Sequence, residues 1–527
     1  MSPRAAAAER ARRWVRVHVA RTQTRDLFYP CLAPAPAGGA TVLRLERASR
    51  PPRDVHLNGR PAAVGDVARD DGGLLVTLAP GALVLPGENV VSVPAACGAR
   101  AAGLSGPAPA GIGWGSFAPA AAGLPGDERL AAAAGFLLRS LSRDPLGPGL
   151  ASLTACDPRA GAPRLWSWYW TTGIVYEALA ALAAHRSGGG GSARGGEGAG
   201  GEAAGAGEPA GATAGLLAAA LAGLEEGLRA RQVPGGGGVD AGGSYLVRWD
   251  PDRAQPAGVQ AWHAPNDAAY LGLHGLLVAH RRHGDEAWLD QARRLAGWVT
   301  GPGCRGTRLR VGWNATTGRW DDSWHYLDAA WTPAFLCALA AATGEEAWLA
   351  RADALARDTI ERFGTDGPFY LKIWRANGRH TRTVFARGMA WVLEGWVPLA
   401  QAGGTWLLPR LDALVRGLLD HQRPDGSWPY LLDQPGSGPC NKGTPALAYH
   451  LRRAAPLLPR VGDRIEEAAA RALGWCDARL DLDPGSAGRG GIVAHNVEGA
   501  IATVRDIPVA VNYASAYYLL ARLERGT

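Results

Sequence analysis

Two aspartates and an arginine occupy equivalent positions of an internal repeat, and together they could do chemistry. Asp267, Asp328 and Arg387 each stand at the start of an apolar helical segment, so the repeat predicts that their side chains face one cavity. Two neighbouring carboxylates can keep a proton near neutral pH, because like-charge repulsion raises the pKa of one of them. Asp is also a favoured N-cap residue, which gives each aspartate alone an ordinary structural explanation. A cation at a helix N-terminus is unfavourable, so Arg387 is expected to meet a buried anion or an anionic ligand.

Aromatic residues accompany these charges. Tryptophans precede both aspartates along the chain, and Trp391 follows Arg387 by one helical turn, on the same face. Sugar rings stack their C–H faces on tryptophan while their hydroxyls need polar partners, so this combination favours a carbohydrate pocket. The indoles of Trp288, Trp298 and Trp348 are instead expected to pack in the core.

A helical hairpin repeats along the chain. A motif that begins at Gly284 returns at Gly344 and, more faintly, at Gly403, and each copy joins an apolar helix to an amphipathic one. The apolar helices are expected at 172–185, 268–282, 329–343, 388–402, 444–455 and 512–524, and the amphipathic helices at 128–142, 216–229, 286–299, 346–362, 406–421 and 463–477. This pattern predicts a mainly α protein, an (α/α)6 toroid of six helical hairpins whose inner helices begin around one mouth of a central cavity. An open superhelical solenoid would use the same hairpins.

The 527 residues exceed what one core normally holds, so the chain is expected to divide. Residues 1–13 are Ala/Arg-rich and expected to be disordered, and the short alternating runs of 14–93 predict a small β-sandwich-like accessory domain. Residues 94–125 read as a Gly/Ala/Pro-rich linker, and 126–527 as the helical, catalytic domain. A low-complexity segment at 187–213 is expected to be a solvated insertion in a loop.

Composition excludes several classes of protein. The net charge of +7 comes from scattered arginines, without the basic and aromatic clusters of a nucleic-acid groove, whereas an anionic oligosaccharide substrate is compatible with it. No apolar run reaches the length of a membrane-spanning helix, and the N-terminus lacks the apolar core of a secretory signal peptide. The sequence therefore does not indicate a cellular compartment. The 7 cysteines form no C-x-x-C pair, so neither a metal site nor a cofactor is expected. Nothing in the sequence indicates an oligomeric state.

Several motifs resemble those of the unsaturated glucuronyl hydrolases and their unsaturated rhamnogalacturonyl hydrolase relatives, which are six-hairpin glycosidases. The motifs are Phe385-Ala-Arg-Gly-Met-Ala-Trp391, Tyr326-Leu-Asp328, Asn266-Asp267 and Gln422-Arg-Pro-Asp-Gly-Ser-Trp428. The similarity runs roughly from Trp166 to the C-terminus, so the N-terminal strands and the 187–213 insertion lie outside the family pattern.

The resemblance implies an activity and roles for individual residues. Such enzymes release a 4,5-unsaturated uronic acid from oligosaccharides made by polysaccharide lyases, through hydration of a vinyl ether. Asp328 would be the general acid/base and Asp267 its carboxylate partner. The residues that would contact the substrate are Arg387, Trp391, Trp170, His380 and Lys442. The chemistry requires no metal and no cofactor.

Three other functions fit parts of the pattern. A toroidal glycosidase could cleave saturated glycans with two carboxylates. A glycan-binding protein could keep the ring without catalysis. A terpene cyclase-like protein is suggested by the turn at Gln422–Trp428, but the chain holds one convincing copy of that turn and no aspartate-rich initiating motif.

Overall fold

The computed structural model describes residues 25–524, apart from 29–31, 35–38, 58–59, 81, 83, 85–90, 108–113, 119–126, 145–146, 153–154, 158–161, 165–169, 189–209, 234–241, 246–261, 315–318, 322–329, 364, 371, 377–378 and 496–507. The expected disordered segment 1–13 and the candidate Asp328 therefore lie outside the described residues.

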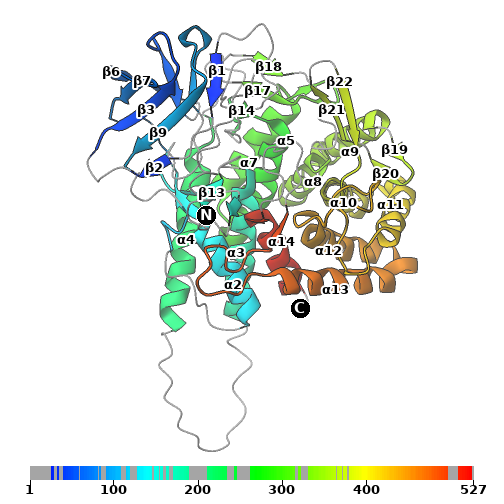
Figure 1. Cartoon of the computed structure of the whole chain (residues 1–527). Coiled ribbons are helices and arrows are strands. Elements are labelled where there is room, and N and C mark those ends of the chain that lie inside the picture. The colour runs from blue at the N-terminus through cyan, green and yellow to red at the C-terminus, as the bar shows by residue number, and fades with distance from the viewer. Residues whose placement is uncertain are drawn as a thin grey trace, which may run out of the picture.

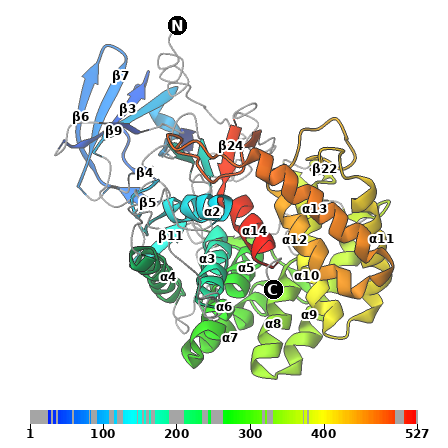
Figure 2. The same ribbon diagram turned by 90° about the horizontal axis from the view of Figure 1, so that it is seen from below.

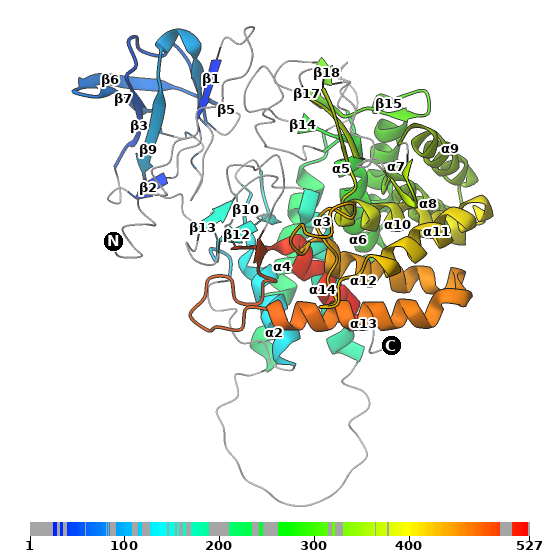
Figure 3. The same ribbon diagram turned by 45° about the vertical axis from the view of Figure 1, so that its right-hand side comes forward.

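The N-terminal strands form two sheets that share one apolar core. One sheet has the order β1 (Arg25–Phe28), β8 (Val91–Pro94), β4 (Val55–Leu57) and β5 (Arg60–Ala62). The other has the order β2 (Leu32–Pro34), β9 (Ala101–Gly106), β3 (Thr41–Glu46), β7 (Gly73–Leu78) and β6 (Val64–Asp70). Alternate residues of β7 are buried, and Leu43 and Val76 of the second sheet join Leu57 and Val93 of the first in a cluster separate from the helical core. Figure 3 shows this β part beside the helices.

The segment expected as a linker begins with ordered structure. After the short 3₁₀ turn η1 (Ala95–Cys97), strand β9 pairs antiparallel with β3, with Leu43 opposite Leu104. Alanine and glycine are poor strand formers, so the sequence pattern did not reveal β9. Pairing with a central strand compensates for that low propensity and extends the β part beyond residue 93.

The apolar helices pack against one another in a closed order. They are α3 (Trp170–Gly188), α5 (Pro265–Leu271) continued by the π turn η3 (Gly272–Leu276) and α6 (Leu277–His283), α8 (Thr332–Thr343), α10 (Ala386–Gln401), α12 (Gly443–Ala454) and α14 (Asn512–Leu523). Each contacts the next in this order, and α14 returns to contact α3. These helices are buried on most faces, as their near-continuous apolar sequences predict.

The amphipathic helices cover this inner set. They are α2 (Glu128–Arg139), α4 (Ala210–Ala230), α7 (Glu286–Thr300), α9 (Glu346–Phe363), α11 (Leu408–Asp420) and α13 (Gly462–Arg479). Viewed from below, α4, α7, α9, α11 and α13 lie on the outside (Figure 2). In α7 the buried residues Trp288, Ala292 and Leu295 follow helical spacing, so one stripe faces the inner helices. The mainly α prediction is therefore confirmed.

The repeated glycine motif has a conformational cause. Gly284 and Gly344 end α6 and α8 in the left-handed region, with φ of 65° and 72°, which glycine adopts without steric cost. Asp285 then caps α7 by accepting a hydrogen bond from the Ala287 amide at 2.9 Å. The motif thus encodes the turn inside each hairpin.

Two expected boundaries differ from the structure. Helix α8 begins at Thr332 rather than at 329, because Pro333 fits only the first turn of a helix. The expected insertion 187–213 is shorter at both ends, since Ser187 and Gly188 complete α3 and Ala210 already belongs to α4. Residues 189–209 of that segment lie outside the described part of the chain.

Short strands connect the helices. β14 (Trp262–His263), β17 (Gly312–Asn314) and β18 (Arg319–Asp321) form one sheet, and β21 (Lys372–Ala376) pairs with β22 (Arg379–Thr383). Both lie along the upper edge of the helical part in Figure 1. The remaining strands are β10 (Leu141–Arg143), β11 (Leu150–Ser152), β12 (Ala155–Asp157), β13 (Ala162–Arg164), β15 (Cys304–Arg305), β16 (Arg308–Leu309), β19 (Thr365–Asp366), β20 (Phe369–Tyr370), β23 (Ala494–His495) and β24 (Pro508–Val511). The 3₁₀ turns η5 (Thr405–Leu407), η6 (Ala455–Leu457) and η7 (Pro459–Val461) lie beside α11, α12 and α13. Within the described part of the chain, no helix combines the length and apolar character needed to cross a bilayer.

Gly395 allows α10 to lie close to the backbone just before α8. A Cβ atom at this position would overlap the carbonyl oxygen of Ala330. We expect Gly395→Ala to lower the free energy of unfolding by about 1–3 kcal/mol, measured by urea denaturation, because the two backbones must separate. Gly297→Ala is the matched control: a Cβ in this interior position of α7 meets nothing within 4 Å, so the substitution should stabilise by about 0.4–1 kcal/mol. Equal stability of the two variants would contradict this account of the packing.

Candidate active site

The N-terminal ends of neighbouring inner helices meet around one group of residues. The indole Nε1 of Trp331, just before α8, donates to the backbone oxygen of Asn266 in α5 at 2.6 Å. The rings of Trp331 and of Trp391 in α10 form a T-shaped pair, with ring centroids 4.6 Å apart. These contacts connect the start of α5, with Asp267, to the start of α10, with Arg387. The repeat predicted that the two residues share one end of the helices.

Asp267 is buried at the start of α5. Asp267 belongs to the first turn of α5, and Ala264 is the N-cap residue of that helix. Only 1% of the surface of Asp267 is exposed. The amide Nδ2 of Asn266 donates to Asp267 Oδ1 at 3.1 Å. The N-cap explanation considered for this aspartate therefore does not apply.

Arg387 lies over aromatic rings near the start of α10. Its Cζ atom is 4.7 Å from the centroid of the Trp391 ring and 5.6 Å from that of Phe385. A desolvated guanidinium gains energy from such stacking, which offsets its unfavourable position at the helix N-terminus. Gly443 at the start of α12 fits directly against the Arg387 backbone, so Lys442 also belongs to this end of the helices.

An aromatic wall extends this group toward α3 and α14. Trp170, the first residue of α3, is partly exposed, and its ring centroid is 5.8 Å from that of Tyr270 and 5.5 Å from that of Tyr513. Trp391 is buried and donates from Nε1 to the Tyr513 hydroxyl at 3.2 Å. Rings from α3, α5, α10 and α14 therefore pack together at this end of the inner helices.

The other predicted site residues are described by the structure to different extents. Asp328 lies outside the described residues, between β18 and Ala330. Lys442 is buried, with 4% exposed, immediately before α12. His380 lies in β22 opposite Arg375, and its side chain is outside the described part. Trp288 and Trp298 are buried in the core as expected, whereas Trp348 is partly exposed and donates to Glu345 at 3.1 Å.

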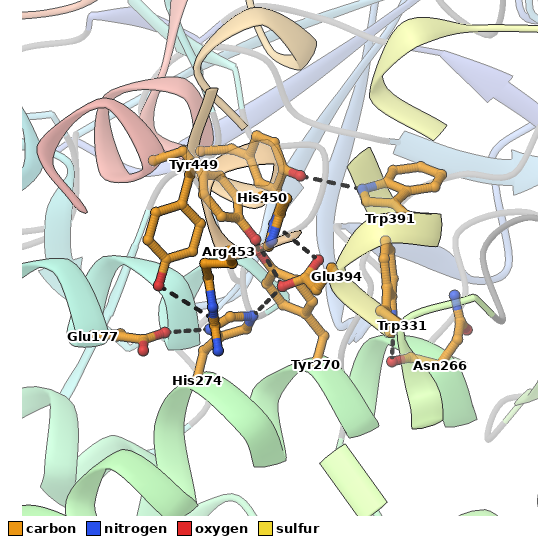
Figure 4. A network of polar contacts seen from close by, with 12 residues as sticks. Glu177, Asn266, Tyr270, His274, Trp331, Trp391, Glu394, Tyr449, His450 and Arg453 are labelled. Carbon is orange, nitrogen blue, oxygen red and sulfur yellow. Dashed lines mark hydrogen bonds and ion pairs between the residues drawn. The ribbon is translucent and has the colours of Figure 1, made fainter. Parts of the chain in front are cut away.

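A buried polar network, which the sequence reasoning missed, lies two helical turns further along the inner helices. Figure 4 shows His274 between two carboxylates, with its Nδ1 atom bonded to Glu177 and its Nε2 atom 2.7 Å from Glu394 Oε1. The Tyr517 hydroxyl donates to the same Glu394 oxygen at 2.8 Å. His450 Nε2 lies 3.8 Å from the other oxygen, Glu394 Oε2. We call Glu177, His274, Glu394 and Tyr517 the inner polar cluster.

Protonation in the inner polar cluster follows from its hydrogen bonds. Burial lowers the pKa of His274, but the Glu177 and Glu394 carboxylates outweigh this and raise it to about 9. Burial would raise the pKa of Glu394, yet the imidazole groups beside it bring that pKa below its usual value. Burial lowers the pKa of His450 to about 4, so this imidazole is neutral at pH 7. His274 is therefore the cation that the two glutamates share.

We expect the free energy of unfolding to fall as the pH rises from 6.5 to above 9. The folded-state pKa of His274, about 9, exceeds the ordinary value of 6.5, so its stabilising effect is complete below 6.5 and is lost as the pH passes 9. The charged and titratable groups around it are Glu177 on α3, Glu394 on α10, Tyr270 on α5, Tyr517 on α14, His450 on α12, Arg281 and Arg453. Urea unfolding across this range should show a loss of roughly 3 kcal/mol that is absent from His274→Leu. An identical slope in both proteins would contradict the assignment.

A signal for the inner polar cluster was present in the sequence. Glu177 follows Trp170, His274 follows Asp267, and Glu394 follows Arg387 by the same two helical turns. A charged residue within an otherwise apolar helix needs a buried partner. Among the described residues, no group of three or more His, Cys, Asp or Glu side chains is placed to hold a metal ion.

Comparison with known proteins shows the class of fold. No family model and no curated protein matches the chain. The crystal structure of an unsaturated glucuronyl hydrolase specific for heparin aligns with a TM-score of 0.51 and 15% identity, over 76% of this chain and 94% of that chain. A possible member of the GH105 family from Klebsiella pneumoniae aligns with a TM-score of 0.41 and 18% identity, over 49% and 71% of the two chains. The unsaturated glucuronyl hydrolase of Bacillus sp. GL1 aligns with a TM-score of 0.42 and 16% identity, over 50% and 74%.

The heparin-specific enzyme is the informative neighbour, because the alignment covers most of both chains. The protein thus has the fold of an unsaturated glucuronyl hydrolase, which confirms, at the level of the fold, the resemblance that the sequence motifs indicate.

Proposed function

We propose that the protein is a glycoside hydrolase that releases 4,5-unsaturated uronic acid from lyase-generated oligosaccharides, and that its inner and outer helices form an (α/α)6 toroid of six hairpins. The observation that supports the proposal is that Asp267, Arg387, Lys442 and Trp170 all stand at the N-terminal ends of inner helices that pack against one another. A carboxylate, two cations and a partly exposed aromatic ring suit an anionic sugar. The solved structure that aligns over most of both chains is that of an unsaturated glucuronyl hydrolase specific for heparin, which agrees with the proposal.

The proposed reaction is hydration of the vinyl ether in the unsaturated ring. Asp328 in its acid form protonates C4, which places positive charge on C5 and the ring oxygen. Water then bonds to C5 while Asp328 accepts one of its protons, so the acid form is restored. The resulting hemiketal opens and releases the attached sugar. Asp267 is the neighbouring carboxylate whose negative charge keeps the proton on Asp328 near neutral pH.

The cations and aromatic residues have binding roles in this proposal. Arg387 pairs with the uronate carboxylate, which its planar guanidinium can hold with two hydrogen bonds. Lys442 meets a second anionic group of the substrate, a carboxylate or a sulfate. Trp170 supplies a stacking surface for the sugar ring, while Trp391 and His380 complete the contacts.

The test is incubation with unsaturated disaccharides produced by lyases from several polyanionic polysaccharides. Loss of the absorbance of the 4,5 double bond, together with release of the second sugar, is the expected result. The corresponding saturated disaccharides are the control, and they should remain intact. Cleavage of saturated substrates alone would indicate an ordinary toroidal glycosidase. Binding of the disaccharides without turnover would indicate a glycan-binding protein, and either result would overturn the proposal.

A further inference from the structure

We propose that Glu394 is a positioning residue, whose carboxylate orients a chain of tyrosine hydroxyls beneath the candidate site and thereby fixes its aromatic floor. We define the aromatic floor as Tyr270, Trp331, Trp391 and Tyr513. The effect on catalysis rests on the function proposed above, whereas the effect on the floor itself does not.

The direction of the hydroxyl chain is set by the carboxylate. Glu394 Oε1 can only accept, so the Tyr517 hydroxyl uses its single proton to donate to it at 2.8 Å. The hydroxyl oxygens of Tyr517 and Tyr270 lie 2.9 Å apart, and Tyr270 must therefore be the donor in that bond. An amide at position 394 could donate as well as accept, so the chain would lose its fixed direction.

Tyr270 connects this chain to the candidate site. It follows Asp267 by one helical turn in α5, so the two residues lie on the same face of that helix. Its ring centroid is 5.0 Å from that of Trp331 and 5.8 Å from that of Trp170. A rotation of Tyr270 would therefore displace the rings that surround the start of α5.

Tyr517 connects the chain to the other side of the floor. Its ring centroid is 4.8 Å from that of Tyr513, whose hydroxyl accepts the Trp391 indole proton at 3.2 Å. Glu394 is also one helical turn after Trp391 in α10. A single carboxylate thus acts on both halves of the aromatic floor, one through Tyr270 and the other through Tyr513.

Glu394 is itself held from the side away from the site. His274 donates to it from the π turn η3, and π turns within helices are frequent at functional sites. The second carboxylate on His274, Glu177, has 19% of its side chain exposed, and Arg281 lies 3.9 Å from its Oε1 atom. Glu394, whose side chain is 3% exposed, is thus the buried end of the row Glu177–His274–Glu394 (Figure 4).

The experiment compares Glu394→Gln with Glu225→Gln. Glu225 is the matched control, because its Oε1 atom also accepts from a tyrosine, Tyr176 at 2.7 Å, and lies 2.9 Å from a histidine nitrogen, that of His283, but on an outer helix. Near-ultraviolet circular dichroism of the tryptophan bands should change in Glu394→Gln and stay as in wild type in Glu225→Gln. On a disaccharide that the wild-type protein hydrolyses, kcat should fall ~10–100-fold in Glu394→Gln, with a smaller change in KM. The displaced rings would still bind the substrate but would no longer hold it in the reactive orientation.

Tyr517→Phe separates positioning from mere stabilisation. If Glu394 acts through Tyr517, Tyr517→Phe should reproduce the change in the tryptophan bands, and the double variant Tyr517→Phe/Glu394→Gln should add nothing further. Independent, additive changes would overturn the proposal, as would wild-type tryptophan bands in Glu394→Gln. A wild-type protein without activity on any unsaturated disaccharide would refute the proposed function, while the dichroism comparison would still decide the role of Glu394.

Discussion

Asp328→Asn should lower kcat on an unsaturated disaccharide by ~10²–10⁴-fold, because an amide can neither protonate C4 nor accept a proton from the attacking water. KM should change little, since the uronate carboxylate is held by Arg387 and the ring by Trp170 in the proposed complex. Single-turnover measurement of the double-bond absorbance separates the chemical step from binding. Retained activity would remove Asp328 from the mechanism.

Asp267→Asn supplies a comparison within the same pair of carboxylates. Without the negative charge of Asp267, the pKa of Asp328 should fall toward that of an ordinary aspartate, so the alkaline limb of the kcat profile should move to lower pH. Asp290→Asn is the control for removal of a charge, since Asp290 is an exposed residue of α7 that pairs with Arg293, three residues further along the same helix, at 3.1 Å. An unchanged pH profile in Asp267→Asn would show that the two carboxylates do not interact.

The helices could be predicted from the sequence because their signals are local and repeated. Helical spacing of apolar residues and the glycine turn at Gly284 and Gly344 set the position of each hairpin without knowledge of distant contacts. Strand β9 was missed for the opposite reason: Ala101–Gly106 has little strand propensity, and only its pairing with β3 makes it a strand.

In the candidate site, too, the residues set by the local repeat could be predicted, and those that depend on distant contacts could not. Equivalence within the repeat brought Asp267 and Arg387 to one end of the inner helices, because a periodic sequence maps onto a periodic structure. The partners of His274 could not be predicted, since Glu177 and Glu394 come from helices far apart in the chain and meet only after the inner helices pack together. The packing of the inner helices is therefore what brings His274 between its two carboxylates.

His274→Leu should lower the free energy of unfolding by about 3–5 kcal/mol, because it leaves the buried Glu394 and the partly exposed Glu177 without their shared cation. Leucine is close to histidine in size, so the loss of charge rather than a cavity dominates the effect. Urea unfolding at pH 7 measures the difference, and the loss should be smaller at pH 4, where protonation of the glutamates removes the uncompensated charge.

His283→Leu is the matched control for that measurement. His283 ends α6, the continuation of the same inner helix, and its Nε2 atom also lies near a glutamate, Glu225, at 2.9 Å. Its side chain is 36% exposed, so water screens the pair and the expected change is about 0–1 kcal/mol. Equal losses in the two variants would show that the inner polar cluster is no more important than a surface pair. A loss confined to His274→Leu would show that the charges of the inner polar cluster are stabilised by one another.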